Sequence, residues 1–196
     1  LAIAQAYQVE FAFQTVQEVV SAIARQRTYH PVARYLTRIR WDGAERIDRY
    51  LVDYLGAEDT ELHRAMSRRF FVACVARAMG QGLQPVKVDT VLILQGPQGA
   101  RKSTSFRTLA GADWFSDTAL DIRNKDAFQS IRGIWLYELA ELAATRPRDA
   151  ETVKAFLSAE TDRYRPPYAR NTVESHRQVV FVGTTNEASF LADPTG

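Results

Sequence analysis

The residues best suited to chemistry lie in one stretch, where an apolar run is followed by glycines and a lysine. The run 88–94 leads to Gly96 and Gly99, and Lys102 and Ser103 open a segment of helical composition. Glycines let backbone N–H groups turn toward phosphate oxygens, and a helix N-terminus adds partial positive charge. This layout is typical of a phosphate-binding loop for ATP, with Lys102 on the phosphates and the Ser103 hydroxyl on Mg²⁺. The expected nucleotide-binding residues are Gly96, Pro97, Gln98, Gly99, Ala100, Arg101, Lys102, Ser103 and Thr104.

One position departs from the G-x-x-x-x-G-K-[ST] pattern, because Arg101 stands where a glycine is expected before the lysine. If the backbone there requires a positive φ, a residue other than glycine costs about 1–2 kcal/mol. A Gly-rich turn between a strand and a helix, with no ligand, remains the alternative interpretation.

Two further apolar runs end in polar side chains. The run 134–137 ends at Glu138, with Glu141 three residues later, and the run 179–182 leads to Asn186. Ligands of open α/β sheets bind at the carboxyl ends of the strands, so we expect these side chains beside the phosphate loop. Glu138 would hold Mg²⁺ with Ser103, Glu141 would orient the attacking water, and Asn186 would contact the γ-phosphate. Taken singly, each is equally a solvated strand end or an Asn-containing turn.

A basic and aromatic segment lies between the last two runs. Arginines alternate with tyrosines around Pro166 and Pro167, which suggests a β-hairpin. Arginine suits phosphate and tyrosine suits base stacking, as in single-stranded nucleic acid binding. A purely structural hairpin with arginines reaching to solvent remains open. The expected nucleic-acid contacts are Lys154, Arg163, Tyr164, Arg165, Tyr168 and Arg170.

The elements that must position these side chains fall into two parts. Residues 1–85 read as helices, including one over 47–55. Their arginines are interpreted as a solvated face, and contact of some of them with nucleic acid is the alternative. From residue 86 strands and helices alternate, which predicts an α/β fold with a mostly parallel sheet. The expected strands are 88–94, 134–138 and 178–184, and the expected helices are 102–110, 126–132 and 150–159.

Composition narrows the class of protein. The 196 residues are 46% hydrophobic and 24% charged with a net charge of +2, which fits a globular protein and reveals no preferred partner. No signal peptide or membrane-spanning run is visible. Cys74 is the single cysteine, so a disulfide within the chain is excluded and a cytoplasmic setting is expected. The absence of an initial methionine suggests a fragment of a longer protein.

The order of these motifs resembles superfamily 3 helicases, which have an AAA+-type core. The residues within these motifs are more similar to the virulence-associated E family of phage, plasmid and pathogenicity-island proteins. The matching residues are His30-Pro31-Val32, Tyr35-Leu36, Trp41-Asp42-Gly43, 54–59, 96–99, 102–104, 114–117, 138–142, 162–168 and 183–186.

The resemblance implies a P-loop NTPase core of three layers over residues 86–196, preceded by a helical subdomain over 1–85. It implies Walker A roles for Lys102 and Ser103, a Walker B role for Glu138 and a sensor role for Asn186. It further implies a homo-oligomeric ring acting on single-stranded DNA, without a membrane. We therefore expect an ATP-hydrolysing core of a primase-helicase-like replication protein. The alternatives are an ATP-binding switch or scaffold with little turnover, motivated by Arg101, and a small-molecule P-loop kinase.

Overall fold

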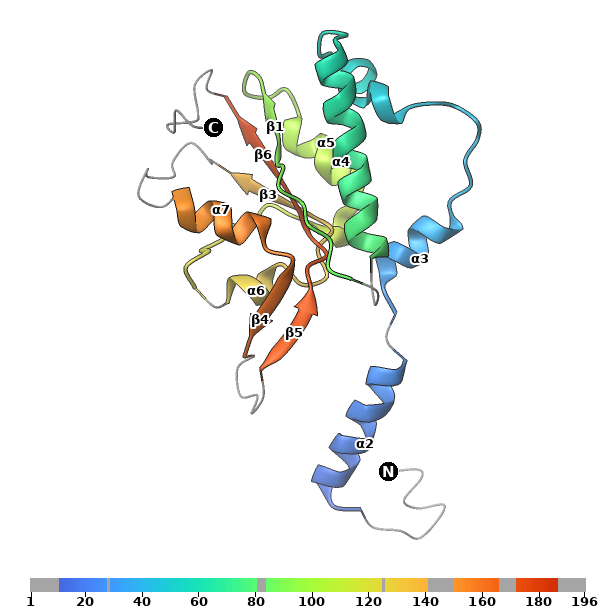
Figure 1. Cartoon of the computed structure of the whole chain (residues 1–196), viewed down its shortest axis with the longest axis vertical. Coiled ribbons are helices and arrows are strands. Elements are labelled where there is room, and N and C mark those ends of the chain that lie inside the picture. The colour runs from blue at the N-terminus through green and yellow to red at the C-terminus, as the bar shows by residue number, and fades with distance from the viewer. Residues whose placement is uncertain are drawn as a thin grey trace.

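The computed structural model describes residues 11–27, 29–80, 84–124, 126–140, 150–165 and 172–186 (Figure 1). Its helices are α2 (Phe13–Gln26), α3 (Pro31–Arg38), α4 (Glu61–Met79), α5 (Lys102–Ala110), α6 (Ala127–Ser130) and α7 (Ala150–Ser158). Its strands are β1 (Leu92–Gln95), β2 (Phe115–Ser116), β3 (Leu136–Ala140), β4 (Thr161–Tyr164), β5 (Val173–His176) and β6 (Val180–Thr185).

Four strands form one sheet in the order β1-β6-β3-β2, and every neighbouring pair in it is parallel. The last strand of the described chain therefore lies between β1 and β3. Its register places Thr185 opposite Gln95 and Thr184 opposite Ala140. The carboxyl ends of β1, β3 and β6 consequently meet at one edge, which confirms an α/β fold with a mostly parallel sheet.

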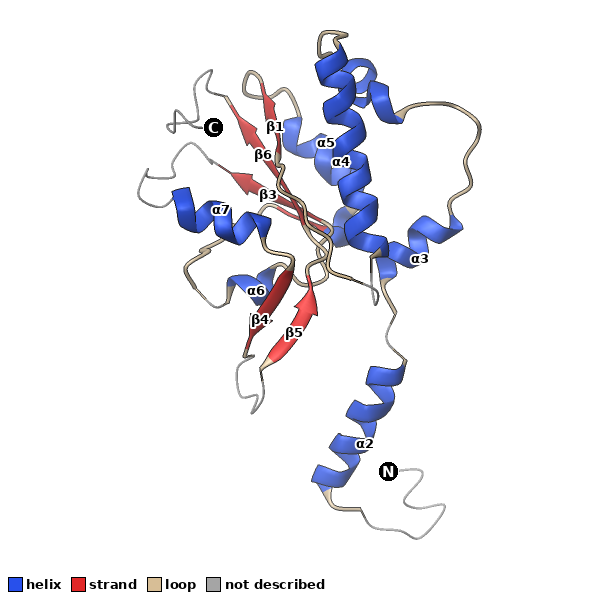
Figure 2. Cartoon of the chain, viewed as in Figure 1, coloured by secondary structure: helices blue, strands red, loops and turns tan. Residues whose placement is uncertain are grey.

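Helices cover both faces of this sheet (Figure 2). Val180 and Val182 of β6 pack in a core cluster with Phe70 of α4 and Phe106 of α5. Phe181, one residue out of phase, packs instead in a second cluster with Phe156 of α7. A strand buried on both faces alternates its side chains between two helical layers, which explains the continuous apolar run.

The helices begin where local capping predicts. His30 precedes Pro31 and accepts a hydrogen bond from the Ala33 backbone N–H at 3.0 Å, so it caps α3. Thr60 caps α4 by accepting from the His63 N–H at 3.1 Å. Such caps satisfy backbone donors that a helix leaves free at its first turn.

The helix expected over 102–110 is confirmed, and the other boundaries shift by a few residues. The strand expected over 88–94 begins only at Leu92, and the helix expected over 126–132 is the single turn 127–130. The segment 47–55 is a 3-10 turn followed by a π-helical turn. Strand β2 was not predicted, because two residues leave no periodicity to read.

The arginines of residues 46–68 support the interpretation as a solvated face. Arg46, Arg49, Arg64 and Arg68 each pair with a nearby aspartate, and these side chains are largely exposed. The division of the chain at residue 85 stays a prediction; α4 itself packs in the same core cluster as β3 and β6. No helix among the described residues has the length and apolar character needed to span a bilayer.

Candidate nucleotide site

The phosphate loop connects the end of β1 to the start of α5. Gly99 has φ 81°, a conformation that favours glycine. Arg101 has φ 57° and ψ 29°, which is left-handed and, among the described residues, the only such case outside glycine. The backbone thus requires a positive φ at the position where the sequence departs from the pattern. Arg101 keeps the loop geometry at a cost of about 1–2 kcal/mol.

The Lys102 ammonium bridges the loop and the end of β6. Its Nζ donates to the carbonyl oxygens of Gly96 at 2.8 Å and Pro97 at 3.0 Å. The same atom donates to Oδ1 of Asn186 at 2.8 Å. These contacts use the three donors of an ammonium group. The structure therefore brings the predicted lysine and the predicted amide together across 84 residues of sequence.

Glu138 of β3 is buried, and only one of its two carboxylate oxygens has a hydrogen-bond partner. Glu138 is 3% exposed. Its Oε1 accepts hydrogen bonds from Ser103 Oγ at 2.7 Å and from Thr184 Oγ1 at 2.5 Å. Its other oxygen, Oε2, is buried without a hydrogen-bond partner. Burying a carboxylate oxygen without a partner is costly, so it marks a place where a cation or donor would be bound favourably.

The residues of the loop line a cavity of about 380 Å³ at the carboxyl edge of the sheet. Thr184 and Asn186 close its β6 side, and Arg101 and Lys102 contribute positive charge. The N-terminus of α5 also points its free N–H groups to this edge, as anion sites require. The lining residues from the loop are Gln98, Gly99, Ala100, Arg101, Lys102, Ser103 and Thr104.

The predicted site residues are mostly brought together. They form two neighbouring hydrogen-bonded groups, one of Lys102 with Asn186 and one of Ser103 and Thr184 with Glu138. Glu141 lies outside the described residues. The prediction gave Thr184 no role of its own. A signal existed, since residues two apart on a strand share a face, which places Val182 and Thr184 on one side of β6.

The predicted hairpin is confirmed, because β4 and β5 form an antiparallel pair. It lies beyond the amino-terminal ends of β3 and β6, away from the phosphate loop (Figure 1). Arg163 and Arg165 are exposed on it, and Lys154 is exposed on α7. Tyr168 and Arg170 fall outside the described residues.

Tyr164 lies differently from the arginines beside it. It is 6% exposed, and its ring stacks on Phe128 with centroids 6.0 Å apart. Its hydroxyl accepts from Arg132 Nη1 at 2.9 Å. These contacts hold the ring against Phe128, which itself packs on the second core cluster, and leave little surface for base stacking.

A buried ion pair joins the two strands of the hairpin at its base. Arg177 Nε donates to Asp162 Oδ1 at 2.9 Å, and the guanidinium lies 4.6 Å from the centre of the Phe156 ring. Its backbone N–H donates to the Glu160 carbonyl at 2.8 Å. Because Arg177 lies in the short connection from β5 to β6, the hairpin leads directly into the strand that carries Thr184 and ends one residue before Asn186.

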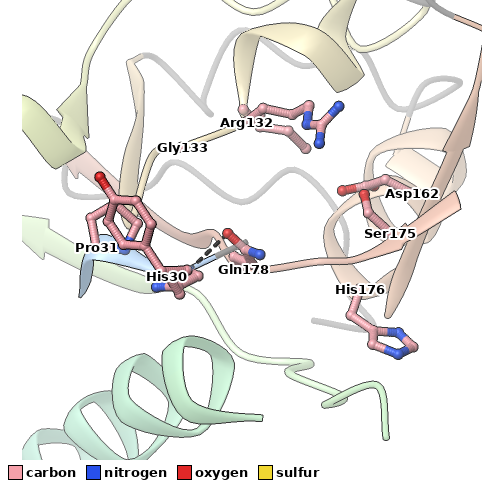
Figure 3. Close-up of a pocket in the computed structure, with 10 residues that line it drawn as sticks. His30, Pro31, Arg132, Gly133, Asp162, Ser175, His176 and Gln178 are labelled. Atoms are coloured by element: carbon pink, nitrogen blue, oxygen red, sulfur yellow. Dashed lines mark hydrogen bonds between the residues drawn. The ribbon is translucent and has the colours of Figure 1, made fainter. Parts of the chain in front are cut away.

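A second cavity, of about 410 Å³, lies where the hairpin meets the amino-terminal ends of β3 and β6 (Figure 3). His30 and Gln178 meet on one side of it, with Nε2 and Oε1 2.8 Å apart. Since His30 Nδ1 accepts from Ala33, the proton of the neutral ring sits on Nε2. Burial lowers the pKa of His30, which favours this neutral form.

The chain was compared with models of known families. Residues 36–196 match the model of the virulence-associated protein E-like domain. No curated protein matches the chain. The matched region includes the phosphate loop, Glu138, the hairpin and Asn186.

Proposed function

The chain belongs to the virulence-associated protein E-like domain family, and from this membership and the geometry above we propose that it is a P-loop ATPase core. In this proposal the chain is the ATPase core of a primase-helicase-like replication protein of a phage, plasmid or pathogenicity island. ATP binds at the loop 96–104, and hydrolysis of the γ-phosphate is coupled to single-stranded DNA.

The observation that carries the proposal is the environment of Glu138. A buried carboxylate with one oxygen held by two hydroxyls and the other without a partner fits a divalent cation better than a structural role. In the described part of the chain, no group of three or more His, Cys, Asp or Glu side chains is placed to hold a metal ion by itself. Mg²⁺ suits such a site, because it usually binds one or two carboxylates and takes further ligands from phosphate and water.

Two residues of this site would hold Mg²⁺. Glu138 would face the ion through Oε2, and Ser103 would turn its hydroxyl oxygen toward it. When bound, Mg²⁺ would neutralise charge on the phosphate oxygens. Thr184 keeps its hydrogen bond to Oε1 and so fixes the carboxylate orientation.

The remaining residues act on the nucleotide directly. Lys102 exchanges its loop carbonyls for phosphate oxygens, since both are acceptors that its Nζ can reach. Asn186 holds Lys102 from the other side and stands where an amide can distinguish ATP from ADP. Backbone N–H groups of the loop and of the α5 N-terminus bind the other phosphate oxygens.

Coupling to DNA follows from the path of the chain. β6 begins three residues after Arg177, at the base of the hairpin, and ends at Thr185, next to Asn186. A shift of the strand end on hydrolysis therefore moves the segment that carries Arg163 and Arg165. In a homo-oligomeric ring, neighbouring copies would move along one strand of DNA in turn.

A second function, an ATP-binding switch with little turnover, is favoured by one observation. Arg101 holds a left-handed conformation where glycine is the unstrained choice. Its side chain, at the mouth of the cavity, can hold phosphate in place rather than promote release.

Two measurements separate these functions. We expect Lys102→Ala to weaken ATP affinity at least tenfold, whereas Lys87→Ala, an exposed lysine outside the loop, leaves it unchanged. Unchanged affinity in Lys102→Ala would remove the site assignment. For the motor, single-stranded DNA raises the ATPase rate, and the double change Arg163→Ala with Arg165→Ala abolishes that rise.

A matched control loses the same two positive charges elsewhere, by Arg64→Ala with Arg68→Ala on α4. Stimulation that survives the hairpin double variant contradicts the DNA assignment. ATP binding without turnover, with or without DNA, supports the switch.

A further inference from the structure

The cavity at the base of the hairpin is a polar site separate from the phosphate loop. Its volume of about 410 Å³ lies within the range of about 300–1,000 Å³ that small-molecule sites span. It is enclosed by the start of α3, the connection from α6 to β3, and the hairpin strands. No residue that lines the phosphate-loop cavity also lines this one. Any ligand of this cavity therefore binds independently of ATP.

Arg132 supplies positive charge to the cavity. Its Nη1 donates to the Tyr164 hydroxyl at 2.9 Å, which fixes the position of the guanidinium. The guanidinium makes no other hydrogen bond and no ion pair with a described residue, whereas exposed Arg107 pairs with Asp117. A guanidinium held at one nitrogen, with further N–H groups available, suits an oxyanion such as phosphate.

Two further polar side chains line the same cavity, Asp162 and Gln178 (Figure 3). Asp162 is 4% exposed, and both hydrogen bonds from Arg177 go to its Oδ1, so Oδ2 keeps its capacity to accept. Gln178 Oε1 meets His30 Nε2 at 2.8 Å, which leaves the amide NH₂ to donate. Because Arg177 balances the charge of Asp162, the surplus charge of the cavity is that of Arg132. An acceptor and a donor together suit the edge of a nucleobase.

Tyr29 provides an aromatic surface at the rim of the cavity. The guanidinium carbon of Arg34 lies 6.0 Å from the centre of its ring, a contact that orients the ring. Tyr29 is nevertheless 71% exposed, unlike Tyr164, so its ring remains accessible for stacking. Stacking on an accessible aromatic ring is how proteins bind unpaired bases.

We propose that this cavity binds one nucleoside monophosphate unit, the unpaired nucleotide of a DNA strand held by the hairpin. Its phosphate pairs with Arg132, its base stacks on Tyr29, and the edge of the base meets Asp162 or Gln178. Asp162 in the cavity and Arg163, a proposed DNA contact, are adjacent on β4, so a strand on the hairpin passes close to the cavity. The proposal rests on the proposed function for its DNA strand. A free nucleoside monophosphate has the same chemistry.

Fluorescence anisotropy with labelled oligothymidylate of about ten nucleotides tests the site. Tyr29→Ala and Arg132→Gln are each expected to weaken binding about tenfold or more, whereas Tyr29→Phe, which keeps the ring, retains it. Arg132→Gln should also lower the slope of log affinity against log salt by about 0.7, because one phosphate contact is lost. The matched controls are Tyr54→Ala and Arg64→Ala, which remove exposed side chains outside the cavity and leave binding unchanged.

Calorimetry with thymidine 5′-monophosphate distinguishes the two sources of the nucleotide. The titration is carried out in the Lys102→Ala background, so that the phosphate loop contributes little. Binding that Tyr29→Ala abolishes supports a site open to free nucleotides as well as to DNA. No binding of the free nucleotide, with weaker oligonucleotide binding in Tyr29→Ala and Arg132→Gln, supports a site for the strand alone. Both ligands binding these two variants as tightly as the unchanged residues would overturn the proposal.

Photo-crosslinking locates the base and separates this proposal from the hairpin assignment. A cross-link from an oligonucleotide carrying 5-iododeoxyuridine to Tyr29, mapped by mass spectrometry, supports stacking in the cavity. Cross-links confined to the hairpin, together with binding that requires Arg163 and Arg165 but neither Tyr29 nor Arg132, remove the cavity site and leave the proposed function standing. Binding that requires Tyr29 and Arg132 but neither hairpin arginine supports the cavity and contradicts the hairpin assignment.

Discussion

Arg101 offers the sharpest test of how the loop is built. Its backbone is left-handed, with φ 57°, and its side chain is exposed. Replacing it with glycine removes about 1–2 kcal/mol of strain. Glycine also costs about 0.5–1 kcal/mol by loosening the unfolded chain. The net gain is about 0.5–1 kcal/mol, which for a chain of this size raises Tm by about 1–4 °C.

The control is Arg101→Ala, which deletes the exposed side chain but keeps a Cβ in the left-handed conformation. We expect no gain in Tm for this variant by thermal unfolding. If Arg101→Ala stabilises as much as Arg101→Gly, charge rather than backbone strain is responsible and the reasoning is refuted. A drop in Tm for Arg101→Gly would refute it equally.

The same pair of variants addresses turnover. If Arg101 slows release of phosphate through its side chain, both variants raise the ATPase rate. If instead the strained backbone limits turnover, only Arg101→Gly raises it. An unchanged rate in both variants removes Arg101 as the argument for a switch.

Three further predictions concern the body of the protein. The lowered pKa of His30 means that, as pH falls, the unfolded chain binds a proton at this side chain before the folded chain does. The free energy of unfolding should therefore fall as pH drops below about 6.5 and stay flat above it. His30→Asn, which keeps an acceptor for the helix cap, should reduce this pH dependence in urea unfolding measured at several pH values. Asp162→Asn leaves the buried Arg177 without its partner and should cost about 3–5 kcal/mol in urea unfolding, whereas Asp117→Asn, in an exposed pair, should change stability by about 0.5 kcal/mol or less. Burial raises the pKa of the Cys74 thiol, so its reaction with a thiol reagent should follow unfolding; fast labelling of the native protein would contradict the packing of α4.

The local parts of the fold were readable from the sequence. The strand, glycines and lysine of the phosphate loop follow from residue types at short spacing, and the helix over 102–110 agrees with its predicted bounds. The left-handed requirement at residue 101 was anticipated from the pattern itself. The hairpin was anticipated from its proline break. Each of these depends on neighbours within a few residues.

The site, by contrast, depends on strand order. Periodicity identified the run that became β6 but did not place it between β1 and β3. Only that order brings Asn186 to Lys102 and Thr184 to Glu138. The burial of Tyr164 was equally hidden, because its partners Phe128 and Arg132 lie more than 30 residues away in the sequence.

The physical reason is the range of the interactions. Turn conformations, helix caps and alternation of side chains are set by adjacent residues, so the sequence determined the phosphate loop and the kinds of element around it. Strand order and the burial of the Glu138 carboxylate arise from packing between distant segments. The tertiary structure alone decided that Glu138 would be a buried carboxylate, with one oxygen that has no hydrogen-bond partner among the described residues.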